Sequence, residues 1–248
     1  MTIPFEPVVF GIPINVHLIL EYAAFFVGFR YYLFLRKRSE DPINSANRLS
    51  IILGAIIGAL LGSRLAALME NPLWMASEIN WLEVLQAKTI MGGLFGGLIG
   101  VELAKKIIGE RRSSGDLFTF PLILGILIGR IGCFLMGVNE FTYGKETTFW
   151  AGMDLGDGLM RHPIALYEIL FLAGLFIILK GVAGRKAPLE SGLLFKLFML
   201  AYFGFRFLIE FLKPNVFFIC GLSSIQWLCL ICWGYYLIIF SKYFTRAN

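Results

Sequence analysis

The sequence is poor in charged residues. Only 16% of its 248 residues are Asp, Glu, Lys or Arg, whereas 58% are hydrophobic, and the mean hydropathy is +0.75. Soluble globular domains carry about 25% charged residues, so this composition excludes that class and indicates an integral membrane protein. The first residues also lack a basic segment ahead of a short apolar run. We therefore expect no cleaved signal peptide, and the first apolar helix is predicted to insert as an ordinary span.

Histidine and cysteine are also scarce, with two and four residues. His17 and His162 have no cluster of carboxylates or cysteines at ligand spacing around them, so neither a metal site nor a cofactor is predicted. Cys229 and Cys232 have CxxC spacing but lie in an apolar segment. We interpret them as packed or lipid-facing side chains, with a zinc or redox role as the alternative.

Long apolar runs dominate the chain instead. A helix needs about 20 mainly apolar residues to cross a hydrocarbon core of roughly 30 Å. The predicted fold is therefore all-α, a single transmembrane domain over residues 1–248 with seven spans. The spans cover about residues 15–35, 48–69, 89–108, 117–137, 163–181, 192–212 and 217–241. The segment 70–88 is too charged to span, but Trp74, Trp81 and Leu85 can lie in the membrane interface.

The basic residues of the loops predict the orientation of these spans. One set of loops holds Arg36, Lys37, Arg38, Arg48, Lys105, Lys106, Arg111, Arg112, Lys180, Arg185, Lys186, Lys242 and Arg246, and the other holds Lys88, Lys145, Arg161 and Lys213. Because Lys and Arg concentrate in cytoplasmic loops, the first set is predicted to be cytoplasmic. The N-terminus and the loop 138–162 then lie outside, and the C-terminus lies inside. The net charge of +5 is explained by these loops, so no nucleic-acid partner is predicted.

Glycines recur at helical spacing in three predicted spans. They are Gly54, Gly58 and Gly62, then Gly92, Gly96 and Gly100, then Gly125 and Gly129. Small residues four apart let helix backbones approach closely inside a membrane. We predict tight helix contacts for most of them, and space for a ligand beside a few.

Polar side chains gather in the predicted outer half of the bilayer. They come from five spans and are His17, Glu21, Arg64, Arg130, Tyr167, Glu168, Tyr202, Arg206 and Glu210. Ionisable groups inside a membrane are costly and are typically functional. Because scattered structural charges would not be so one-sided, we interpret the set as one lipid-accessible site.

The arginines of this set indicate an anionic ligand. A guanidinium presents a planar fork of donors that suits phosphate, so Arg130 and Arg206 predict a phospholipid headgroup in the outer leaflet. In the alternative interpretation, Arg206 pairs with Glu210 four residues on and Arg130 pairs with Glu168, both in purely structural roles.

The external loop 138–162 follows Arg130 closely. It carries Asn139 and Glu140 near its start and His162 at its end. A polar loop of this length is expected to act as a lid or as a dock for a second substrate. His162 precedes a proline and can simply mark the entry into the next span, but both histidines lie on the predicted outer side, where a proton acceptor would be useful.

Four stretches resemble a known family. GRIGCF (129–134), followed by Gly144, resembles the signature G-R-x-G-N-F-x-N-x-E-x-x-G of the bacterial prolipoprotein diacylglyceryl transferases. MGGLFGGLIG (91–100) resembles the family's H-G-G-L-x-G, and HPIALYE (162–168) resembles its P-x-Q-L-Y-E. YFGFRFLIEFLKP (202–214) resembles its Y-x-x-x-R-x-x-x-E-x-x-R-x-P.

The resemblance implies an activity. Such enzymes move the diacylglyceryl group of phosphatidylglycerol to the lipobox cysteine thiol of a preprolipoprotein, forming a thioether and releasing glycerol phosphate. It implies a multi-pass protein of the bacterial plasma (inner) membrane, with membrane lipids around it and a site facing the outer leaflet. Its partners would be phosphatidylglycerol as donor and the preprolipoprotein signal peptide as acceptor. Because the reacting cysteine belongs to the substrate, none of the four cysteines here need be catalytic.

The resemblance also implies roles for residues. Arg130 and Arg206 would hold the leaving phosphate, Glu210 would orient Arg206, and Tyr202 would line the same face. The residues implied in substrate binding are Arg130, Arg206, Gly92, Gly93, Asn139, Glu140, Gly144, Tyr167, Glu168, Arg64 and Glu21.

The chain departs from the family pattern at several positions. Met91, or Phe95 in a shifted alignment, replaces the family histidine, and Cys133 and Met136 replace two asparagines. Because two residues are inserted before the acidic residue of the family signature, both Asn139 and Glu140 are candidates for that position. The general base must then be another group, with His17, His162 and Glu21 as candidates. Two alternatives follow: a divergent paralogue with a phospholipid donor and another acceptor, or a lipid-binding or transport protein without catalysis.

Overall fold

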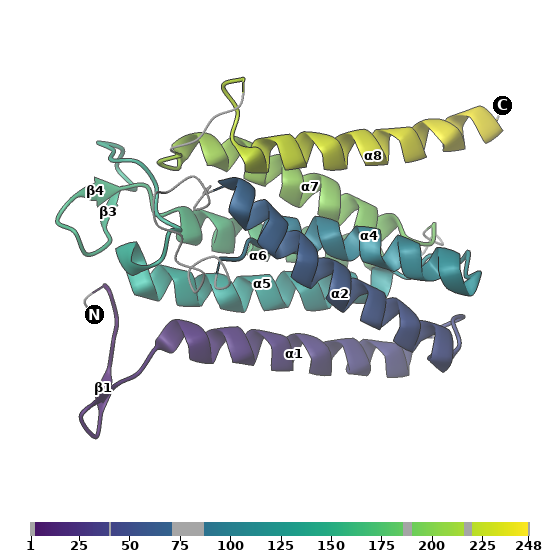
Figure 1. Cartoon of the computed structure of the whole chain (residues 1–248), viewed down its shortest axis with the longest axis horizontal. Helices are drawn as coiled ribbons and strands as arrows, with labels where there is room; N and C mark the ends of the chain where they lie inside the picture. Colours follow the sequence, from purple (N-terminus) through teal and green to yellow (C-terminus); the bar gives the residue numbers. More distant parts are fainter. Residues whose placement is uncertain (1–2, 40, 71–86, 186–189, 216–219, 248) are drawn as a thin grey trace. The chain divides into compact units, whose positions relative to one another are not determined.

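The computed structural model describes residues 3–39, 41–70, 87–185, 190–215 and 220–247 (Figure 1). Within these residues the α-helices are α1 (Val16–Arg38), α2 (Ser45–Glu70), α4 (Ile90–Ile108), α5 (Asp116–Met136), α6 (Ile164–Ala183), α7 (Leu193–Ile209) and α8 (Ser224–Ala247). Short 3₁₀ helices η2 (Gly137–Asn139) and η3 (Glu210–Leu212) continue α5 and α7. Two small antiparallel hairpins pair β1 (Val8–Val9) with β2 (Ile12–Pro13) and β3 (Met153–Asp154) with β4 (Met160–Arg161). The predicted all-α class is confirmed.

The first six helices lie within three residues of their predicted bounds, whereas the last, expected at residues 217–241, is Ser224–Ala247. The side-chain hydroxyl of Ser223 accepts a hydrogen bond from the backbone N–H of Gln226 at 3.2 Å, and the side chain of Gln226 accepts one from Ser223 N–H at 2.9 Å. This reciprocal capping box fixes the first turn at Ser224. The predicted interfacial residues Trp74, Trp81 and Leu85 lie outside the described residues.

Several helices are suited to a bilayer. Among the described residues, four are long and apolar enough to cross a membrane: α1, α2, α5 with η2, and α6. A shorter apolar helix, Ser224–Ile239, forms most of α8. Helices α4 and α7 occupy two further predicted spans with 19 and 17 residues. The structure thus agrees with an integral membrane protein, while the number and orientation of its spans stay predictions.

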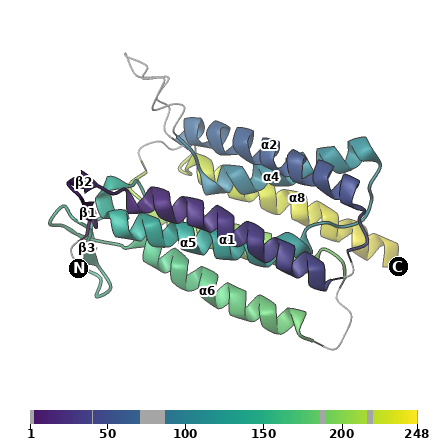
Figure 2. The same cartoon turned by 90° about the horizontal axis from the view of Figure 1, so that it is seen from below.

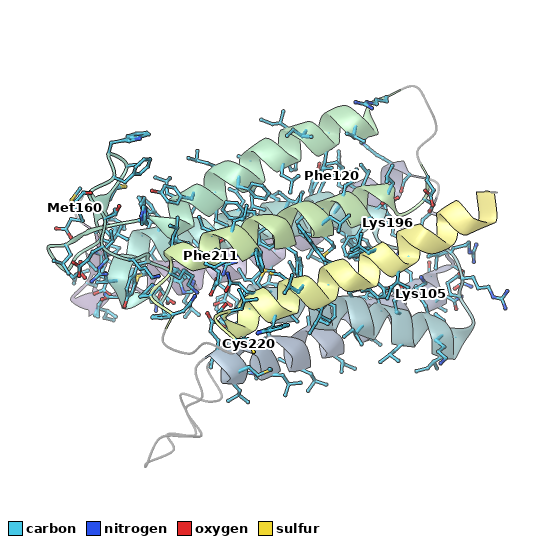
Figure 3. All side chains as sticks on the ribbon, turned by 90° about the horizontal axis from the view of Figure 1, so that it is seen from above. Lys105, Phe120, Met160, Lys196, Phe211 and Cys220 are labelled. Atoms are coloured by element: carbon cyan, nitrogen blue, oxygen red, sulfur yellow. The ribbon has the colours of Figure 1, made fainter. Side chains whose placement is uncertain are left out.

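The chain divides into two compact units. The first comprises Met1–Glu40, Ser114–Ala201 and Phe211–Pro214. In it, α1 lies along α5, and α6 packs against α5 (Figure 2). The ring of Tyr32 stacks on Phe118 with centroids 4.8 Å apart, which ties the C-terminal half of α1 to the start of α5. Helix α5 runs from the Phe120 end of this unit toward the loop that carries Met160 (Figure 3).

The second unit comprises Asp41–Ser113, Tyr202–Glu210 and Asn215–Asn248. Its main packing is α2 along α4, through glycines at Gly54, Gly58, Gly62, Gly92, Gly96 and Gly100. A Cβ added to Gly54 would lie only 2.6 Å from the carbonyl oxygen of Gly100, so the two backbones leave no room for a side chain. The predicted tight contacts are confirmed for these six glycines. Gly129 is not in such a contact, because a Cβ there would meet no described atom within 4 Å.

Candidate functional site

A buried ion pair joins α5 and α6 in the first unit. Arg130 Nε lies 2.9 Å from Oε1 of Glu168, and the two side chains are 9% and 0% exposed. The pairing considered from the sequence is therefore present. A buried arginine needs such a partner, because an uncompensated charge in a low-dielectric interior is very costly. Glu168 thus fixes the guanidinium of Arg130 in one place inside the unit.

A second cluster lies around His17, in the first turn of α1. Its Nδ1 lies 3.0 Å from Oε1 of Glu140, and its Nε2 lies 3.6 Å from Sγ of Cys133. Nη1 of Arg130 lies 3.7 Å from the same sulfur and donates to it. The cluster therefore consists of a thiol, an imidazole, a carboxylate and a guanidinium. Among the described residues, no set of three or more His, Cys, Asp or Glu side chains is arranged to hold a metal ion.

Local structure explains why His17 reaches the cluster. Asn15 caps α1 by accepting a hydrogen bond from Leu18 N–H at 2.9 Å, so the helix begins at the level of His17. Gly132 of α5 faces the histidine, and a Cβ there would lie 3.0 Å from Cδ2 of His17. A larger residue at this position would push the imidazole away from Cys133.

The loop after α5 gives different partners to the two candidate residues for the acid. Asn139 donates to Oε1 of Glu6 at 3.1 Å, on the exposed side. Glu140 turns the other way and meets His17. Gly137 ends α5 and turns the chain into this loop, since its φ of 55° is left-handed and its place beside the carbonyl oxygen of Leu155 has no space for a Cβ.

The second histidine has different partners. His162 Nδ1 lies 3.2 Å from the hydroxyl of Tyr167. Gly144 N–H donates to the carbonyl oxygen of His162 at 2.9 Å, and a Cβ on Gly144 would lie 2.6 Å from that of His162. Nearby, the guanidinium of Arg161 hydrogen-bonds Asp157 and holds the pKa of that carboxyl below its ordinary value. Gly144 and Tyr167 therefore position His162 and the end of the loop.

The remaining candidates lie in the second unit or away from the cluster. Arg206 Nη2 donates to Oε2 of Glu210 at 3.1 Å, and both are buried, so the pairing considered from the sequence is present. Tyr202 is fully buried, and Arg64 is half-buried with an Nη1 that has no hydrogen-bond partner among the described residues.

The other site predictions fall on α4 and α1. Gly92 packs against the backbone of Gly62, and Gly93 is in ordinary contact with Ser63. Glu21 is half-buried on α1, while His17 pairs with Glu140. Arg130 belongs to the first unit and Arg206 to the second, so the binding of one phosphate by both arginines stays a prediction.

Sequence reasoning missed the place of Cys133. From the sequence, this residue was identified only as a substitution in the family motif. The structure brings it to a histidine 116 positions away in the chain. The only indication of this contact in the sequence is that Cys133 and His17 both lie near the outer ends of predicted spans.

Long apolar helices that carry buried arginine–glutamate pairs define a class, the polytopic membrane proteins with a polar site among their helices. A family model described as prolipoprotein diacylglyceryl transferase matches residues 7–241, and this chain belongs to that family. The resemblance inferred from the motifs is confirmed.

Individual relatives agree with the family match. The chain is 33% identical to the phosphatidylglycerol–prolipoprotein diacylglyceryl transferase of Wolbachia pipientis subsp. Culex pipiens, over 84% of this chain and 82% of that protein. It is 38% identical to the protein of that name from Nitratidesulfovibrio vulgaris, over 68% of this chain and 62% of that protein. It is 35% identical to the protein of that name from Bordetella parapertussis, over 73% of this chain and 69% of that protein.

Proposed function

We propose that this protein transfers the diacylglyceryl group of phosphatidylglycerol to the lipobox cysteine thiol of a preprolipoprotein. A thioether forms, and glycerol phosphate leaves. The family match over residues 7–241 carries the proposal, and the buried arginines beside acidic partners support it. We further propose seven spans with the N-terminus outside, in a bacterial plasma membrane, so that the site faces the outer leaflet.

In this proposal His17 is the general base. Nδ1 of His17 faces the carboxylate of Glu140. A neutral imidazole that carries its proton on Nδ1 donates to this carboxylate and has a free lone pair on Nε2. That nitrogen points toward Cys133 and the guanidinium of Arg130. A substrate thiol that reaches Nε2 would lose its proton there and attack the glycerol carbon. His17 thereby accepts the proton in place of the family histidine, because Met91, which stands at that position, has no basic group.

Arg130 is proposed to stabilise the departing phosphate. Glu168 holds Nε of the guanidinium, and Nη1 lies 3.7 Å from Cys133 in the cluster. Donors fixed in advance around a developing anion lower the barrier, because they need no reorganisation during the reaction. Arg206, held by Glu210, is proposed as the second donor to the same phosphate.

The test uses membranes that contain this protein, phosphatidylglycerol labelled in its acyl chains, and a synthetic lipobox peptide. We expect the label on the peptide cysteine and none on a peptide with serine at that position. The enzyme from Bordetella parapertussis serves as the positive control. If that enzyme modifies the peptide and this protein does not, the proposed acceptor is wrong.

A second candidate keeps the phospholipid donor and changes the acceptor. Met91 and Cys133 favour it, because they replace two polar side chains of the family motif. Lipid analysis of a deletion strain separates the two candidates. Loss of lipoprotein modification supports the first, whereas loss of a lipid species with intact lipoproteins supports the second. A protein that only binds or moves lipid would lose lipid binding in Arg130→Ala and Arg206→Ala and would show no turnover with either acceptor.

A further inference from the structure

Cys133, His17 and Glu140 form a chain of contacts from thiol to carboxylate. The sulfur meets Nε2 of the imidazole at 3.6 Å, and Nδ1 on the other side meets the carboxylate at 3.0 Å. A nucleophile within reach of a base, which a third group orients, is the arrangement that activates cysteine in covalent catalysis. The three residues come from α1, α5 and the loop after η2, so this geometry arises from the fold and not from a local motif.

We propose that Cys133 is a nucleophile that takes an acyl chain from a membrane glycerophospholipid and carries it as a thioester. This activity goes beyond the proposed diacylglyceryl transfer, and the two reactions would share His17, Glu140 and Arg130. In the diacylglyceryl transfer the nucleophile is the thiol of the substrate protein, and the bond that breaks joins carbon to phosphate oxygen. In the acyl transfer the nucleophile belongs to this chain, and an ester carbonyl is attacked.

The surroundings of the sulfur suit this chemistry. The thiolate is the nucleophilic form of cysteine, and a neighbouring cation stabilises it. Arg130 supplies that cation at 3.7 Å, with Glu168 holding the far side of the guanidinium. In the proposed reaction the same guanidinium also donates to the oxyanion of the tetrahedral intermediate. Arg130 therefore supports both the attacking sulfur and the charge that develops during the attack.

A small cavity lies beside Cys133. It measures about 10 Å³ and is bordered by Cys133, Thr142, Tyr143 and Pro163, among others. Such a volume holds roughly one water molecule, which is also the size of a carbonyl oxygen. Cys133 itself is 7% exposed. The cavity beside this buried cysteine can therefore hold a group as small as a carbonyl oxygen.

The bonds and protons of the step balance. Sγ of Cys133 bonds to the carbonyl carbon of the ester, and the bond from that carbon to the glycerol oxygen breaks. The thiol proton passes to Nε2 of His17 and then to the departing oxygen. The products are an acyl thioester on Cys133 and a lysophospholipid, and the step needs no oxidant or reductant. Glu140 holds the imidazole in place throughout.

The experiment uses the full chain in vesicles of phosphatidylglycerol whose acyl chains end in an alkyne. A fluorophore attached to the alkyne reveals labelled protein, neutral hydroxylamine cleaves thioesters but not thioethers, and mass spectrometry of peptides locates the label. We expect hydroxylamine-sensitive label on Cys133 in the native chain. Cys220→Ser is the matched control, since it removes an exposed thiol outside the cluster, and it should label as the native chain does.

Three variants test the role of the cluster. Cys133→Ala should lose the label, and His17→Asn and Glu140→Gln should acquire it at least about tenfold more slowly, because a positioned base contributes on the order of 10²-fold or more. Thermal unfolding in detergent shows whether each variant is folded. Should Cys133→Ala fail to fold, Cys133→Ser replaces it, and any label on the serine must resist neutral hydroxylamine.

Three outcomes would overturn the proposal. The first is a native chain without label at Cys133. The second is label that His17→Asn and Glu140→Gln leave unchanged, because acylation would then not involve the base. The third is label that hydroxylamine cannot remove, which would be a diacylglyceryl thioether on Cys133. Transfer to a lipobox peptide is read in parallel as a hydroxylamine-resistant product, so failure of the diacylglyceryl transferase proposal is distinguishable from failure of this one.

Discussion

Oε1 of Glu140 lies 3.0 Å from Nδ1 of His17, although three complete predicted spans separate the two residues in the sequence. The contact gives the histidine a fixed orientation, with Nε2 directed toward Cys133 and Arg130. A carboxylate behind a histidine holds the imidazole and stabilises its positive charge when it accepts a proton. Proton transfer in this protein is therefore expected to depend on Glu140 as a positioning residue.

Replacing that carboxylate by an amide should slow the transfer reaction. Glu140→Gln keeps the shape of the side chain but removes the charge that stabilises protonated His17. We expect kcat for the lipobox peptide to fall at least about tenfold while KM changes little, because the effect concerns the base and not substrate binding. Glu146→Gln is the matched control, since Glu146 is 65% exposed and pairs with Arg161 at 3.9 Å. Equal rates for both variants would contradict the role given to Glu140.

Two glycines on α5 make a matched pair for the approach of His17. In Gly132→Ala the new Cβ would lie 3.0 Å from Cδ2 of His17 and 3.3 Å from its Cα, so the start of α1 must shift. In Gly129→Ala the new Cβ meets no described atom within 4 Å. We expect Gly132→Ala to lose activity. Gly129→Ala should keep it and gain about 0.5–1 kcal/mol of stability, since alanine favours a helix interior over glycine. Activity and thermal unfolding measured on both proteins check this, and full activity in Gly132→Ala would be evidence against the cluster.

The buried pair of Arg130 and Glu168 is expected to matter for stability. Removing one partner of a buried ion pair leaves a desolvated charge and costs about 3–5 kcal/mol. We therefore predict a large fall in unfolding temperature for Glu168→Ala. Glu102→Ala removes the carboxylate of a more exposed pair with Lys105, and such surface pairs contribute about 0–1 kcal/mol. Thermal unfolding in detergent compares the two variants. A similar small shift in both would show that Glu168 does not compensate Arg130.

The turn after α4 should give a pH-dependent contribution to stability. Hydrogen bonds from the side chain and backbone of Arg112 lower the pKa of Glu110 from 4.5 to about 2. Since the folded state holds this carboxylate ionised, the contribution is fully present above pH 4.5 and is lost as the pH falls through about 2. In Glu110→Gln the contribution is absent at every pH. We expect the unfolding temperatures of native and variant protein to differ near neutral pH and to converge toward pH 2. A constant difference across this range would contradict the low pKa.

The helices were predictable because hydropathy and run length are local properties. The apolar runs of α1, α5 and α6 define those helices to within a few residues. The start of α8 was predicted too early because the apolar composition continues upstream of the Ser223–Gln226 capping box, which hydropathy does not detect. The two hairpins were missed because each strand has only two residues.

The site was predictable only in part. The depth of a residue in the membrane follows from its position in a span, so Arg130, Glu168, Arg206 and Glu210 could be selected, and their pairings could be considered. Which face of α1 meets α5 depends on the close approach at Gly132, and the direction of Glu140 depends on the left-handed Gly137. Neither property is visible in the hydropathy pattern. The contact of His17 with Cys133 and Glu140 therefore required the structure.

Diacylglyceryl transfer has two products, and measuring both in one reaction tests it most directly. The purified protein is placed in phosphatidylglycerol vesicles with a lipobox peptide, the modified peptide is quantified by mass spectrometry, and free glycerol phosphate is assayed in the same tube. We predict equal amounts of thioether-linked peptide and glycerol phosphate, both lost in Arg130→Ala. Unmodified peptide without glycerol phosphate, in a reaction where the Bordetella parapertussis enzyme forms both products, would contradict the proposed function.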